Sequence, residues 1–61
     1  MKTFTAATIR STIKAAIKSG MSQGAAESHA ELCLEQAESQ LGADKCKAAR
    51  AELNAIMAEN A

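Results

Sequence analysis

The sequence predicts an all-α fold: an antiparallel helical hairpin plus a third helix, forming a small helical bundle that is expected to be oligomeric. Three observations predict it. Charged side chains recur every fourth residue, glycines interrupt the chain between the charged segments, and the chain contains no proline. Residues four apart share one face of a helix, so each set of charges forms a stripe. The expected helices span about 5–19, 25–41 and 45–59 within a single domain, 1–61.

The hairpin is predicted by the register of two charged stripes. The basic stripe of the first segment and the acidic stripe of the second would pair at constant register across the glycine-flanked loop: Lys18 with Glu27, Lys14 with Glu31, and Arg10 with Glu35. This is the pattern expected of two antiparallel helices with opposite charges along a shared seam. Exposed ion pairs contribute only about 0–1 kcal/mol each. We therefore expect these charges to select register more than to add stability.

Residues at the expected helix ends support the three segments. Thr3 or Thr5 can cap the start of the first helix, and Gly20 suits the left-handed residue that follows its end. The second helix is expected to stop before Gly42, and Asp44 to cap the third. These signals predict short connections, as antiparallel helix neighbours require.

Apolar side chains at helical spacing predict the core and an oligomer seam on the three helices: Ile9, Ile13, Ile17, Leu32, Leu34, Leu53, Ile56 and Met57. Much of the remaining apolar content is alanine, which adds little volume. A single core in so short a chain rarely supplies more than about 3–5 kcal/mol. Leu32 and Leu34 lie on different faces of the second helix, so more than one buried surface is expected. Both points favour a homo-oligomer.

Six of the seven lysines and arginines fall into two groups that are candidates for binding a partner or an anion: Arg10, Lys14 and Lys18 on the first helix, and Lys45, Lys47 and Arg50 at the start of the third. A basic stripe can follow nucleic-acid phosphates. The net charge of zero, the neighbouring glutamates and the single aromatic residue, Phe4, weigh against that alternative. At the third helix, backbone amides and cations together would suit a small anionic or phosphorylated ligand. The competing interpretation is a solvated charged turn.

His29, Cys33 and Cys46 are the residues that could together bind zinc. Their spacing matches no standard zinc motif, so we interpret both cysteines as small buried hydrophobes and expect no metal and no cofactor. An internal disulfide is not expected, because the two cysteines would be offset by roughly 9 Å along antiparallel helices. This offset does not apply to a disulfide between two subunits, which is a separate alternative.

No catalytic residues are expected. The single histidine lacks the partners of a catalytic triad, and the cysteines form no C-x-x-C motif. The sequence also shows no signal peptide and no span for a membrane, and two cysteines without a signal peptide favour the cytoplasm. We therefore expect a small non-enzymatic regulator or protein–protein interaction module that binds itself and an unidentified protein. Short alanine-rich chains of this kind are common among phage and plasmid accessory proteins, but no motif here identifies a family.

Overall fold

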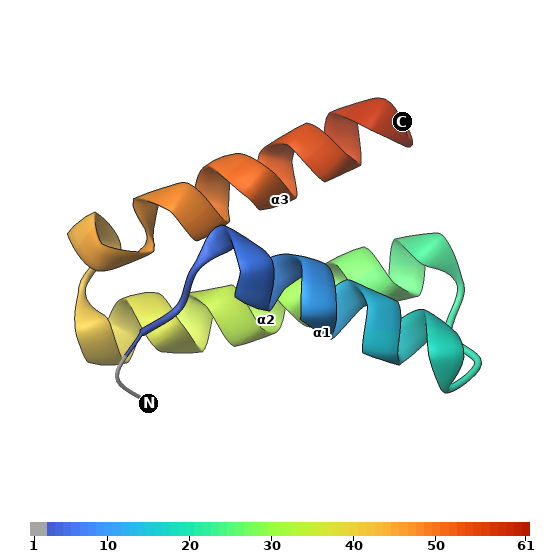
Figure 1. Ribbon diagram of the computed structural model, residues 1–61, viewed down its shortest axis with the longest axis horizontal. Coiled ribbons are helices and arrows are strands. Elements are labelled where there is room, and N and C mark those ends of the chain that lie inside the picture. The colour runs from blue at the N-terminus through green and yellow to red at the C-terminus, as the bar shows by residue number, and fades with distance from the viewer. Residues whose placement is uncertain (1–2) are drawn as a thin grey trace.

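The computed structural model describes residues 3–61, which form three α-helices (Figure 1). Helix α1 spans Ala6–Lys18 and α2 spans Gln23–Leu41. A short 3₁₀ helix, η1 (Ala43–Cys46), leads into α3 (Lys47–Glu59). Figure 1 shows α2 antiparallel to both α1 and α3, and α3 packs against both other helices. The predicted fold class is therefore confirmed, with the third helix packed against its own hairpin.

Both ends of α1 follow from its sequence. At the start, Thr5 is the cap: its hydroxyl accepts from the Thr8 amide and the Thr8 hydroxyl accepts from the Thr5 amide. At the other end, Gly20 has a φ of 108°. The Gly20 amide donates to the Ile17 carbonyl and the Met21 amide to the Ala16 carbonyl. These two bonds form a Schellman motif, which ends the helix as Gly20 predicted.

The starts of α2 and α3 differ from the prediction. Helix α2 begins two residues earlier than expected, because the Ser22 hydroxyl accepts from the Ala25 amide and caps it. Asp44, the expected cap of the third helix, lies inside η1, and neither η1 nor α3 has a side-chain cap. The 3₁₀ turn starts directly after Gly42, so Asp44 is already within helical backbone and cannot cap it.

The core lies where the three helices meet and is rich in alanine. Its members are the buried apolar residues Phe4, Ile9, Ile13, Ala16, Ala26, Ala30, Leu34, Ala37, Cys46, Ala49 and Leu53. Ile56 packs against this core from a partly buried position. Small residues let helices approach closely, so these alanines form contacts although each contributes little apolar area.

Three residues that were expected in the core or the oligomer seam are exposed in the folded chain: Ile17 (42%), Leu32 (61%) and Met57 (41%). Helix α2 turns Ala30 and Leu34 into the core. Leu32 lies about 200° from each of them around the helix, because successive residues are about 100° apart. Its side chain therefore points away from α1 and α3. Whether a second copy covers it stays a prediction.

The predicted charge register between α1 and α2 is wrong. Among residues 3–61, none of the three expected pairs is formed. Arg10 instead pairs with Glu52 of α3 at 3.4 Å, and Glu31 pairs with Arg50 of α3 at 2.7 Å. The physical reason is that α3 packs against both helices and offers each stripe a competing partner.

We expect Gly42→Ala to destabilise the protein by about 1–3 kcal/mol, because Gly42 has a φ of 97° and a ψ of 143°, which an L-residue rarely adopts. The matched control is Gly24→Ala. Gly24 lies in the first turn of α2 with open space around its Cα, so alanine should stabilise by about 0.5–1 kcal/mol. Urea denaturation measures both. Equal effects of the two substitutions would contradict this account of the second turn.

Candidate interaction surface

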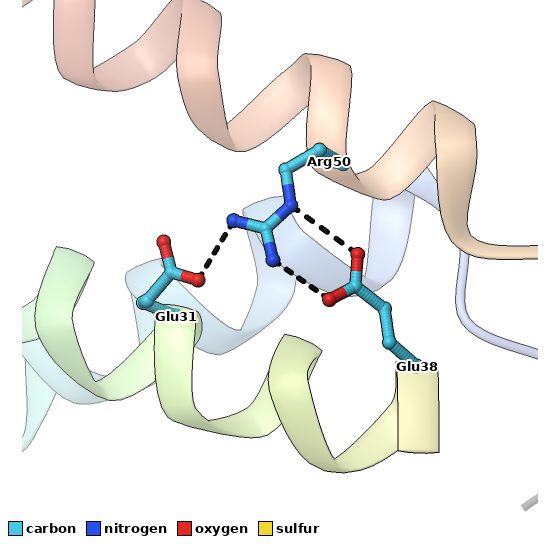
Figure 2. A network of polar contacts seen from close by, with 3 residues as sticks. All are labelled: Glu31, Glu38 and Arg50. Carbon is cyan, nitrogen blue, oxygen red and sulfur yellow. Dashed lines mark hydrogen bonds and ion pairs between the residues drawn. The ribbon is translucent and has the colours of Figure 1, made fainter. Parts of the chain in front are cut away.

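Arg50 joins α3 to α2 through two glutamates, as Figure 2 shows. One guanidinium nitrogen donates to Glu31 Oε2 at 2.7 Å, and two others donate to the Glu38 carboxylate at 2.8 and 3.3 Å. Glu31 and Glu38 are seven residues apart, so they lie on the same face of α2, two turns from each other. Bidentate pairing of this kind is the stronger form of an arginine–carboxylate contact. Arg50 is therefore engaged inside the molecule.

These contacts further favour the charged form of Arg50. Hydrogen bonds donated to Glu38 and then to Glu31 raise the pKa of Arg50 above its ordinary value, while burial opposes the rise. A group with a raised pKa contributes stability that is fully present below its unfolded pKa and is lost only as the pH rises through the folded one. For an arginine that range lies far above neutrality. Loss of the arginine charge therefore does not limit this contact near neutral pH.

The structure does not bring the second basic group together as a site. Arg50 faces α2, whereas Lys45 in η1 and Lys47 at the start of α3 are exposed. Within residues 3–61, neither lysine forms an ion pair. With Arg50 engaged elsewhere, two solvated lysines are left where an anion site was predicted.

The basic stripe of α1 is the more accessible group. Arg10 has one partner, Glu52, and its side chain remains 58% exposed. Lys14 and Lys18 are exposed, and in the described part of the chain neither forms an ion pair. The glutamates that were expected to neutralise this stripe lie on α2, where Glu31 is engaged by Arg50.

Exposed apolar side chains lie beside these lysines. Ile17 is adjacent to Lys18 and one turn from Lys14, and Met21 lies three residues after the end of the helix. Both apolar side chains are exposed, and the Schellman motif fixes the backbone of Met21 there. We call Lys14, Ile17, Lys18 and Met21 the α1 surface. Sequence reasoning named Lys14 and Lys18 as candidate binding residues but missed the apolar part of this surface, because it placed Ile17 in the core or oligomer seam.

His29 and Cys33 come close to each other on α2, with 3.9 Å between Nε2 and Sγ. Cys46 is fully buried in the core, and both cysteines are free. The three residues that the sequence suggested as zinc ligands therefore do not meet within one chain. Among residues 3–61 no three histidine, cysteine or acidic side chains form a group that could hold a metal ion.

The described part of the chain contains no pocket. In residues 3–61 no helix combines the length and apolar character needed to cross a membrane. Comparisons with protein-family models, with curated proteins and with solved structures give no significant match to this chain.

Proposed function

We propose that this protein is a small non-enzymatic interaction module or regulator, which binds an acidic surface of a partner protein through the α1 surface. The observation that supports the proposal is the combination of Lys14 and Lys18, both without ion-pair partners among the described residues, with the exposed side chains of Ile17 and Met21. Self-association, which the thin core favours, belongs to the same proposal.

The two kinds of side chain in the α1 surface have different roles in binding. Burial of Ile17 and Met21 supplies affinity, at roughly 25 cal/mol per Å² of apolar surface removed from water. Lys14 and Lys18 supply charge complementarity, which steers association and rejects basic partners. A standard interface covers about 800 Å² of each partner. That is about a fifth of the 4002 Å² that this protein exposes, so such a partner would extend well beyond these four residues.

The test is affinity capture from a nuclease-treated lysate of the source cells with three baits: the wild type, Lys14→Glu/Lys18→Glu, and Lys45→Glu/Lys47→Glu. The last bait carries the same change of charge on lysines that are also exposed. We expect the wild type and the Lys45/Lys47 variant to retain a common acidic protein, with at least tenfold less retained by the Lys14/Lys18 variant. Circular dichroism checks that all three are folded.

Equal retention of the same proteins by all three baits would contradict the proposed surface. Selective loss with the Lys45/Lys47 variant would move the site to the start of α3. Each bait should then be measured against the purified partner by isothermal titration, because capture alone does not separate direct from indirect binding.

Nucleic acid is the second candidate, and one observation favours it: Lys14 and Lys18 are not neutralised by the glutamates of α2. Fluorescence anisotropy with mixed-sequence duplex and single-stranded DNA and RNA tests it at low salt. Phosphate contacts would give an affinity that falls with ionic strength at a log–log slope of about −0.9 per contact on duplex DNA. Absence of binding at low salt would exclude this candidate.

A further inference from the structure

Helix α2 carries an exposed strip without charged residues on the side away from its glutamates. With about 100° per residue, the strip consists of Ala25, His29, Leu32, Cys33, Gln36 and Gln40. Cys33 is half-buried at the edge of the core, and the other five residues are exposed. The four glutamates of α2 lie on other faces of the helix.

His29 and Cys33 lie side by side on this strip. They are four residues apart, one helical turn, and Nε2 lies 3.9 Å from Sγ. Tetrahedral zinc holds nitrogen at about 2.0–2.1 Å and sulfur at about 2.3 Å, which puts the two ligand atoms roughly 3.6 Å apart. A small rotation of either side chain would close the difference of about 0.3 Å. Imidazole nitrogen and thiolate sulfur are also ligands that zinc accepts.

The pair supplies only half of a tetrahedral site, and nothing else in the described chain completes it. Cys46 is fully buried, and no third histidine, cysteine or acidic group joins the pair in residues 3–61. A second copy of α2 related by a two-fold axis would bring two further ligands of the same kinds. The missing charge on the strip allows two copies to approach without repulsion, and Leu32 provides an apolar side chain for them to cover.

We propose that His29 and Cys33 form a half-site for Zn²⁺, and that one zinc ion joins two copies of the protein through a site of two histidines and two cysteines. Each cysteine binds as its thiolate, so zinc binding releases the thiol proton to solvent and involves no oxidation. The zinc-linked dimer uses α2, whereas the proposed partner surface lies on α1. Failure of the partner surface on α1 would therefore leave the zinc proposal unaffected.

The experiment is light scattering behind size exclusion in a non-thiol reductant, with one zinc ion per two chains or with a chelator. With zinc we expect a mass near twice the 6.3 kDa of one chain, and with the chelator a lower mass. Co²⁺ in place of zinc should give the visible bands of a tetrahedral site and a thiolate charge-transfer band. His29→Gln and Cys33→Ser should each abolish the zinc-dependent mass change, while Gln36→Ala on the same strip should leave it intact.

Cys33→His gives a second, independent readout. Histidines one turn apart also chelate zinc, so this variant should still dimerise with zinc but lose the thiolate charge-transfer band with Co²⁺. One zinc bound per chain with no change in mass would overturn the proposal. A zinc-dependent dimer that survives both His29→Gln and Cys33→Ser would overturn it as well. The substituted residues lie outside the buried core, so the variants should fold, and circular dichroism verifies this.

Discussion

Replacement of Leu34 by alanine is expected to leave the protein largely unfolded at room temperature. Leu34 is fully buried on α2, where the three helices meet. Truncation of a buried leucine costs about 2–5 kcal/mol, including the cavity that it leaves. A core in a chain of this length supplies only about 3–5 kcal/mol in total. Loss of the helical signal in circular dichroism, or a urea midpoint near zero, measures the effect.

Leu32→Ala is the matched control on the same helix. Leu32 is 61% exposed, so its truncation removes few contacts and should change the free energy of unfolding by less than about 0.5 kcal/mol. If the two substitutions destabilised equally in the chelated, zinc-free protein, Leu32 would have to be buried in solution. The orientation of α2 described above would then be wrong, or an oligomer without metal would cover that face.

Arg50→Ala is expected to cost about 1–2 kcal/mol of stability. The substitution removes three hydrogen bonds and leaves Glu31 and Glu38 without their cation. Arg50→Lys should recover less than half of the loss, because an ammonium group cannot reproduce the bidentate contact with Glu38. Urea denaturation gives both values.

Arg10→Ala is the control for Arg50→Ala, since it removes the same side chain from an ion pair of poorer geometry. Arg10 makes one contact, to Glu52 at 3.4 Å, and is mostly exposed, so we expect a change below about 0.5 kcal/mol. Equal losses of unfolding free energy on replacing either arginine would show that the Arg50 contacts are not formed in solution as described.

The helices could be predicted from the sequence because their signals are local. Thr5 and Gly20 act within one turn of the residues they cap, and the i, i+4 spacing of charges needs no knowledge of the rest of the fold. Even at α2 the error in the expected start was only two residues, since Ser22 caps a helix that begins at Gln23. The role of Asp44 could not be predicted from local signals, because a 3₁₀ turn before α3 places this residue within helical backbone, where it cannot cap the helix.

The partners of the charged stripes could not be predicted in the same way. Spacing places Glu31 on a face of α2 but does not say which neighbouring helix that face meets, and α3 offers an arginine where α1 offered a lysine. The same ambiguity placed Ile17 and Leu32 in buried seams. Alanine was expected to add little volume to the core, yet alanines such as Ala30 form much of it where the three helices meet.

The candidate surfaces were accordingly only partly visible in the sequence. Lys14 and Lys18 were identified, but their availability depends on where the glutamates of α2 are engaged. The one-turn spacing of His29 and Cys33 was also visible. It was set aside because the spacing of the candidate ligands matches no standard zinc motif, and the 3.9 Å between Nε2 and Sγ is what supports a half-site.

Helix α3, not α1, engages the acidic face of α2 through Arg50, and this leaves Lys14 and Lys18 of α1 without ion pairs among the described residues. Double-mutant cycles by urea denaturation test it directly, with Glu31→Ala combined with Arg50→Ala in one cycle and with Lys14→Ala in the other. We expect a coupling of about 1 kcal/mol between Glu31 and Arg50, and less than about 0.3 kcal/mol between Glu31 and Lys14. A larger coupling of Glu31 to Lys14 than to Arg50 would contradict the account.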